Sequence, residues 1–180
     1  MEKAAPVDRE TNGPFDASEV GVLNPYLDFG SIRIAPRSEM QIRAEVEDAN
    51  KRVIAITIEI KGHTLQLQAF AATRSEGLWL ATVEGLSKTI AEQGGSASKR
   101  TGPLGIELLT EIPAQNKKSL FIGVDGPRWF LRGLINGPDL AGPNYAELMS
   151  VFRSTVVNRG ETALPPGDLL PLKLPVANNG

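Results

Sequence analysis

The sequence contains no cysteine and only one histidine, His63, among its 180 residues. Without cysteine there is no disulfide, no thiol nucleophile, no iron–sulfur cluster and no thiolate zinc site. A single histidine also excludes a metal site built on two imidazoles of one chain. Aromatic residues make up 6% of the chain, which disfavours the aromatic-lined clefts in which carboxylate pairs hydrolyse glycosides.

Phosphate-binding and nucleophile motifs are missing as well. The chain has no Gly-x-x-x-x-Gly-Lys-Ser/Thr loop, and no Gly-x-Gly-x-x-Gly follows a strand and opens a helix. The Gly-x-Ser-x-Gly turn that presents a nucleophilic serine is also absent. We therefore expect no catalytic residues, no metal ligands and no bound cofactor.

Long apolar runs and strong basic charge are lacking too. No window approaches the ~20 apolar residues of a membrane span, and the polar N-terminus does not resemble a signal peptide. The net charge is −2, which argues against a dedicated nucleic-acid binder with a large basic face. We expect a cytoplasmic protein that binds no membrane and whose primary partner is not a nucleic acid.

The charge is unevenly distributed along the chain, since residues 1–50 hold 10 acidic and 5 basic side chains. Residues 1–24 lack hydrophobic periodicity, which predicts a largely flexible acidic arm. Alternatively, the arm covers a basic patch on its own domain or on a partner. Residues 25–160 are long enough for a single domain. Residues 161–180 form a Pro- and Leu-rich extended tail, which we expect to dock as far as about residue 175, on its own domain or across a second copy in a homodimer.

Alternation of apolar and polar residues predicts a series of strands. The segment 53–60 is rich in isoleucine, which is typical of a central strand. The expected strands cover residues 30–34, 40–46, 53–60, 63–72, 104–112, 120–125 and 128–135. Because turn residues join several of them directly, we expect an antiparallel sheet.

Two helices interrupt this series. In residues 75–93, Trp79, Val83 and Ile90 lie on one helical face, and Thr73 or Ser75 is placed to cap the N-terminus. The second helix is expected at residues 145–157. The order of elements predicts an α+β fold, with a mainly antiparallel sheet of six or seven strands packed with two principal helices.

One predicted hairpin carries the densest group of candidate binding residues. Arg128, Trp129 and Arg132 follow its turn, and Arg74 comes shortly after the predicted strand of residues 63–72. Arginines beside an aromatic ring suit recognition of a phosphate or carboxylate. In the alternative interpretation, Trp129 and Phe130 belong to the core, and the arginines cover sheet faces or pair with acids.

Three segments carry a resemblance to a known family. They are residues 66–79, residues 123–133 with the run Gly-Val-Asp-Gly-Pro-Arg-Trp-Phe-Leu-Arg-Gly, and residues 168–175. From residue 13 to residue 175 the chain resembles an actinobacterial family known as domain of unknown function 3710. The resemblance implies a bacterial cytoplasmic protein and brings no catalytic residues. The order of elements is also similar to the fold of the PsbP and Mog proteins, which mostly act by binding.

Two functions are consistent with these observations. The first is a non-catalytic binding or adaptor module, whose partner is an unknown protein or an anionic small molecule. The second is an enzyme or regulator that acts on a nucleotide or other anion through arginines and carboxylates. A pocket that holds Arg74, Arg128 and a perturbed carboxylate favours the second function, whereas a flat apolar surface favours the first.

Overall fold

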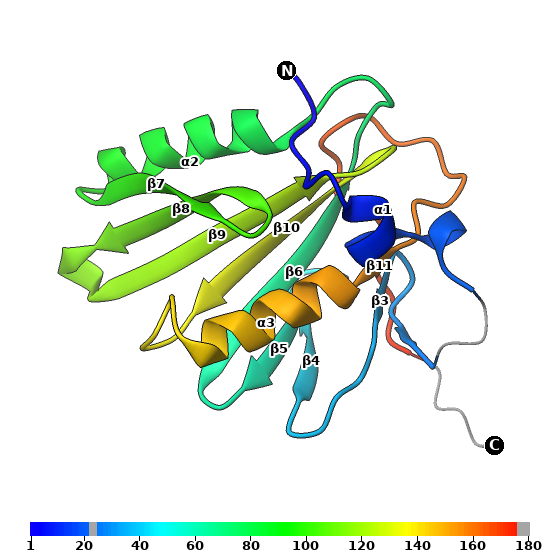
Figure 1. The fold of residues 1–180 in the computed structure, drawn as a ribbon, viewed down its shortest axis with the longest axis horizontal. Coiled ribbons are helices and arrows are strands. Elements are labelled where there is room, and N and C mark those ends of the chain that lie inside the picture. Colours follow the sequence, from blue (N-terminus) through cyan, green and yellow to red (C-terminus); the bar gives the residue numbers. More distant parts are fainter. Residues whose placement is uncertain (22–24, 176–180) are drawn as a thin grey trace.

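A seven-stranded antiparallel sheet forms the centre of the molecule (Figure 1). The computed structural model describes residues 1–21 and 25–175. The strand order is β4-β5-β6-β10-β9-β8-β7. These strands are β4 (Gln41–Val46), β5 (Val53–Ile60), β6 (His63–Ala71), β7 (Ser96–Gly102), β8 (Gly105–Ile112), β9 (Lys117–Asp125) and β10 (Trp129–Asn136).

A smaller sheet of four short strands lies beside the large one and has the order β1-β11-β3-β2. Its members are β1 (Phe15–Asp16), β2 (Leu27–Asp28), β3 (Ile32–Ile34) and β11 (Val156–Val157). β1 runs parallel to β11, and the other two pairings are antiparallel. The predicted α+β class with a mainly antiparallel sheet is thus confirmed, and the larger sheet has seven strands.

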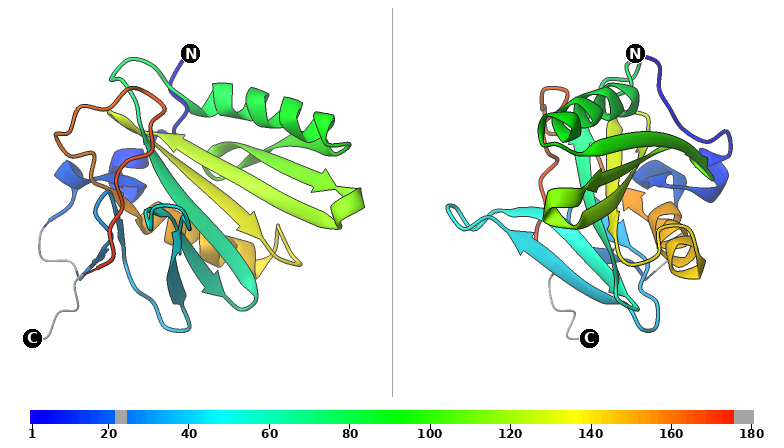
Figure 2. Two further views of the ribbon diagram at one scale, coloured as in Figure 1. Left: turned by 180° about the vertical axis from the view of Figure 1, so that it is seen from behind. Right: turned by 90° about the vertical axis from the view of Figure 1, so that its left-hand side faces the viewer.

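The two principal helices, α2 (Trp79–Glu92) and α3 (Pro143–Ser154), cover opposite faces of the large sheet (Figure 2). Neighbouring side chains of a strand point to opposite faces, and β10 shows the consequence. Phe130 packs with Trp79 of α2, whereas Leu131 belongs to the cluster that contains Phe152 of α3. Gly123 of β9 lies directly under the indole of Trp79, where any Cβ atom would overlap the ring.

Three local predictions differ from the structure. The strand β7 was not predicted, because its sequence Ser-Ala-Ser-Lys-Arg-Thr-Gly has no apolar alternation and it lies at the edge of the sheet. α2 begins at Trp79 rather than near residue 75. The second helix ends at Ser154, and Val156 lies in β11 instead.

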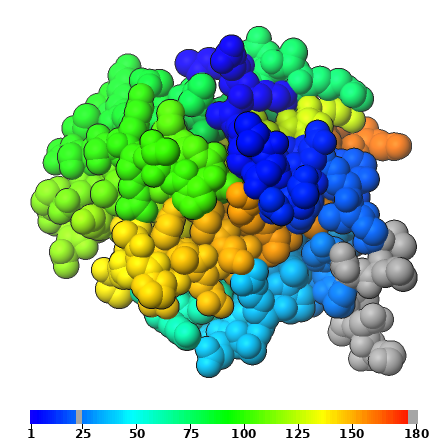
Figure 3. All heavy atoms as spheres, in the orientation of Figure 1, coloured from blue at the N-terminus to red at the C-terminus, as the bar shows by residue number. Residues whose placement is uncertain are grey.

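The N-terminal arm makes specific contacts with the domain. Lys3 Nζ donates hydrogen bonds to the carbonyl oxygens of Thr73 (2.8 Å) and Gly126 (2.6 Å). Further along, the short helix α1 (Arg9–Asn12) buries Arg9, whose guanidinium pairs with Glu19 at 2.7 Å. Figure 3 shows this part of the chain, in dark blue, lying on the surface beside α3. Although the arm is acidic overall, two of its basic side chains, Lys3 and Arg9, make these contacts.

The C-terminal tail runs along both sheets. The Leu170 amide donates to the Ala69 carbonyl of β6 (2.8 Å), and the Lys173 amide donates to the Phe29 carbonyl beside β3 (2.9 Å). Leu170 is fully buried, whereas Leu174 is 61% exposed. The part of the predicted tail that covers residues 176–180 lies outside the described residues.

Candidate functional site

Three arginines from separate parts of the chain line one cavity of about 420 Å³. Arg74 follows β6, Arg128 lies in the turn before β10, and Arg159 follows β11. Asp16 of β1, Ser18, Asn158 and Glu161 also line this space, which we call the arginine cavity.

Among the described residues the three guanidinium groups form no ion pair, although the carboxylates of Asp16 and Glu161 line the same cavity. Burial, together with the nearby positive charge of Arg128, lowers the pKa of Arg159. Positive charges gathered in this way repel one another, and a bound anion relieves the repulsion.

Asp16 is held in its ionised form at the wall of the arginine cavity. It accepts hydrogen bonds from the indole Nε1 of Trp129 at 2.8 Å and from the backbone nitrogen of Ser18 at 3.1 Å. Burial alone raises the pKa of Asp16, but the hydrogen bonds from Ser18 and Trp129 outweigh it, so the pKa lies below its usual value. A carboxylate with such a pKa is ill suited to be a general base or acid near neutral pH.

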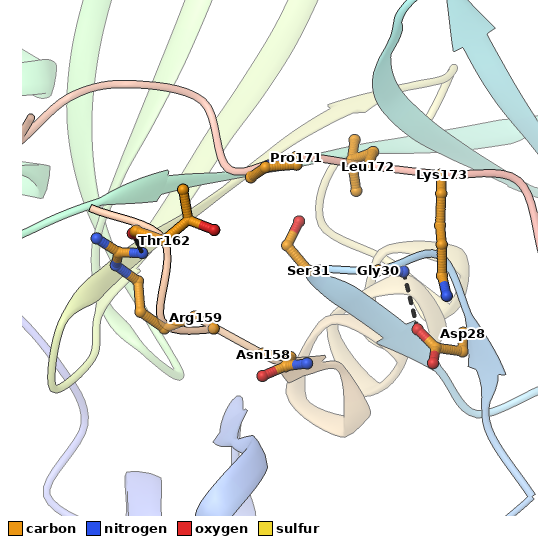
Figure 4. A pocket seen from close by; sticks show the side chains of 10 residues that line it. Asp28, Gly30, Ser31, Asn158, Arg159, Thr162, Pro171, Leu172 and Lys173 are labelled. Atoms are coloured by element: carbon orange, nitrogen blue, oxygen red, sulfur yellow. Dashed lines mark hydrogen bonds between the residues drawn. The ribbon is translucent and has the colours of Figure 1, made fainter. Parts of the chain in front are cut away.

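A second cavity of about 300 Å³ adjoins the first and shares Asn158, Arg159 and Gly160 with it (Figure 4). We call it the Ser31 cavity. Its other walls come from β2–β3 and from residues 171–173 of the tail. Arg159 bridges the two spaces, and its Nη1 donates to the carbonyl oxygen of Thr162 at 2.9 Å.

Two polar atoms at the Ser31 cavity lack hydrogen-bond partners. Ser31 is 5% exposed; within the described part of the chain, neither its Oγ nor the Nε of Arg159 has a partner. Leaving a buried polar group unpaired costs about 1–3 kcal/mol. Both atoms are inaccessible to solvent, so a ligand in the cavity could pair with them only after a local rearrangement.

The sequence of this chain matches the family described as protein of unknown function (DUF3710) over residues 13–179. The chain belongs to this family. All residues of the arginine cavity and the Ser31 cavity lie within the matched range, whereas Lys3 and Arg9 of the arm lie outside it. No curated protein and no solved structure matches the chain, so the similarity of its element order to the PsbP and Mog proteins stays a prediction.

The residues that the sequence singles out in this family member fall into three places. Arg74 and Arg128 come together in the arginine cavity. Trp129 is fully buried; it holds Asp16 through its indole, and the guanidinium of Arg9 lies 5.7 Å from its ring centroid. Arg132 lies elsewhere, beside α2. Because β10 begins at Trp129, Arg128 belongs to the turn and does not share a strand face with Arg132.

Arg159 is the site residue that sequence reasoning missed. It follows the predicted second helix with no aromatic neighbour and no motif to mark it. Its place beside Arg128 arises because β11 pairs with β3 and β1. Such long-range pairing leaves no local signal in the sequence.

Two further findings bear on the class of the protein. No helix among the described residues combines the length and apolar character needed to cross a membrane. In the same ranges, no three His, Asp or Glu side chains gather where they could hold a metal ion.

Proposed function

We propose that this protein is a non-catalytic binding module that holds an anionic small molecule in the arginine cavity. The observation that carries the proposal is the set of three guanidinium groups, from Arg74, Arg128 and Arg159, that line one cavity and form no ion pair in the part of the chain that the structure describes. Guanidinium groups match the oxygens of phosphates and carboxylates in charge and geometry. The cavity volume lies in the range typical of small-molecule sites.

The arginine cavity brings Arg74, Arg128 and a carboxylate with a shifted pKa together, the combination named above for an enzyme or regulator, but the downward direction of the Asp16 shift supports binding. An enzyme that acts on the same anion by general acid–base catalysis needs a group that gains or loses a proton near neutral pH. The lowered pKa of Asp16 keeps this carboxylate ionised, so its role is to hold the walls of the cavity through Ser18 and Trp129. We expect the binding to take place in the bacterial cytoplasm, the compartment that the family resemblance implies.

The test uses inorganic phosphate and pyrophosphate as probes. Isothermal titration calorimetry on the full chain compares the wild type with the double variant Arg128→Gln/Arg159→Gln. Losing hydrogen bonds to a charged group at ~1.5–3 kcal/mol each corresponds to about a 10- to 100-fold weaker affinity per arginine. Pyrophosphate, with more negative charge, is expected to bind more tightly than phosphate.

The matched control is Arg43→Gln, which removes an exposed arginine of β4 that already pairs with Glu45. This variant should bind both anions as the wild type does. Two results would overturn the proposal: wild-type protein that binds neither probe at millimolar concentration, or a double variant that binds them as tightly as the control. Release of orthophosphate from pyrophosphate would favour the enzyme instead.

A further inference from the structure

Arg132 lines a third cavity, which shares no residue with the two described above. This space of about 290 Å³ lies on the α2 face of the large sheet. Phe70 and Phe130 line it from the sheet. Leu78, just before α2, lines another side together with Ala81 and Thr82 of α2, and Gly167 lines it from the tail. We call it the Arg132 cavity.

The guanidinium of Arg132 is held in place but not neutralised. It lies over the ring of Phe70, 5.2 Å from the centroid, and donates a hydrogen bond to Oε1 of Gln68. None of the ion pairs found in residues 1–21 and 25–175 includes Arg132. Burial lowers the pKa of Arg132, which is the sign of a cation that has lost water without gaining a counter-charge.

The remaining walls of the cavity are uncharged. Among the described residues, Arg132 is the one charged side chain that lines it. The rings of Phe70 and Phe130 stack with their centroids 5.8 Å apart and an interplanar angle of 25°, so the side of the cavity next to the sheet is apolar. A complementary ligand has an apolar, flat body and a single negative charge at one end.

We propose that the Arg132 cavity is a second binding site, which takes a small aromatic carboxylate. The carboxylate accepts hydrogen bonds from the free nitrogens of the Arg132 guanidinium, and the aromatic body packs on Phe70 and Phe130. Gln68 and Phe70 position the guanidinium from below, so little side-chain entropy is lost on binding. The site is independent of the arginine cavity, because the two share no lining residue.

The experiment compares 2-naphthoate with its neutral analogue 2-naphthamide, which has nearly the same shape. Titration calorimetry on the full chain should show naphthoate binding about 10- to 100-fold more tightly than naphthamide, the effect of hydrogen bonds to a charged partner. Arg132→Gln should abolish this preference. Arg43→Gln is the matched control, because the strand register places Arg43 on the same sheet face as Gln66, the neighbour of Gln68 on β6.

A second variant keeps the test decisive if Arg132→Gln disturbs folding. Ala81 is exposed on α2 and lines the mouth of the cavity, so Ala81→Phe should block entry without touching the guanidinium. Naphthoate binding should then weaken at least about tenfold. Equal affinity of the wild type for naphthoate and naphthamide would overturn the proposal. So would failure of naphthoate to bind, or binding that survives both Arg132→Gln and Ala81→Phe.

Discussion

Replacing Asp125 by alanine should destabilise the protein through the loss of one carboxylate that joins three segments. Asp125 ends β9 and is 2% exposed. Its Oδ1 accepts a hydrogen bond from the backbone nitrogen of Leu78 at 2.7 Å, and its Oδ2 accepts one from that of Ala4 at 2.9 Å. The nitrogen of Trp79 lies 3.3 Å from both oxygens. Asp125 therefore caps α2 from a distant strand and also holds the arm.

The size of the effect follows from these donors. Loss of a helix N-cap costs about 1–2 kcal/mol, and a buried donor left without a partner costs about 1–3 kcal/mol. In the variant, α2 has no N-cap and the buried backbone nitrogen of Trp79 has no acceptor. We therefore expect the free energy of unfolding to fall by about 3 kcal/mol. In a domain of this size that corresponds to a fall in Tm of roughly 6–12 °C.

The assay is chemical and thermal unfolding followed by circular dichroism, combined in a double-mutant cycle. The second change is a chain that starts at Ala5 and so lacks the Ala4 nitrogen. Both changes break the same hydrogen bond, so together they should cost less than the sum of their separate effects. Asp48→Ala, in the exposed turn between β4 and β5, is the control and should be close to neutral.

Two outcomes would refute this reasoning. One is a loss below about 1 kcal/mol for Asp125→Ala, which is less than a single typical cap contributes. The other is strict additivity of the two changes, which would mean that the arm does not rest on Asp125 in solution.

Two other changes should alter stability. A chain that begins at Gly13 loses Arg9, which is 8% exposed and covers Trp129. We expect the Tm of this chain, measured by calorimetry, to fall by more than ~5 °C, whereas an unchanged Tm would support a flexible arm. Burial and the hydrogen bond to Glu107 raise the pKa of Tyr145, so the folded state keeps this proton when the unfolded state releases it. The free energy of unfolding should therefore fall as the pH rises above about 10, and it should fall less steeply in Tyr145→Phe than in the wild type. Equal dependence of the unfolding free energy on alkaline pH in the wild type and the variant would contradict this.

The large sheet could be predicted because its central strands carry their information locally. In β5 and β6, apolar side chains recur at every second position, and the structure buries that face. The strand β7 lacks this pattern and forms because β8 offers its edge. The start of α2 was misplaced for a related reason: its capping carboxylate, Asp125, lies 46 residues beyond Trp79 in sequence.

The residues of the candidate site likewise separate into those that local sequence could suggest and those that it could not. Arg74 and Arg128 could be proposed because they stand near turns and, for Arg128, beside an aromatic residue. Arg159 could not, since only the pairing of β11 with two distant strands brings it to the cavity. The burial of Trp129 depends on Asp16, a residue 113 positions away that satisfies its indole nitrogen. Sequence alone therefore suggests which residues suit a site, while tertiary contacts decide which of them meet.

The tail makes the order of synthesis matter for the Ser31 cavity. One wall, at Gly30 and Ser31, is made early, whereas the opposite wall, at Pro171 and Lys173, is translated about 140 residues later. Contacts between such distant segments form late in folding, because a long loop must close before they contribute. A nascent chain still lacking residues 171–173 can pair its central strands, yet it has no Ser31 cavity. The Ser31 cavity therefore exists only once residues 171–173 have been translated and have docked beside Gly30.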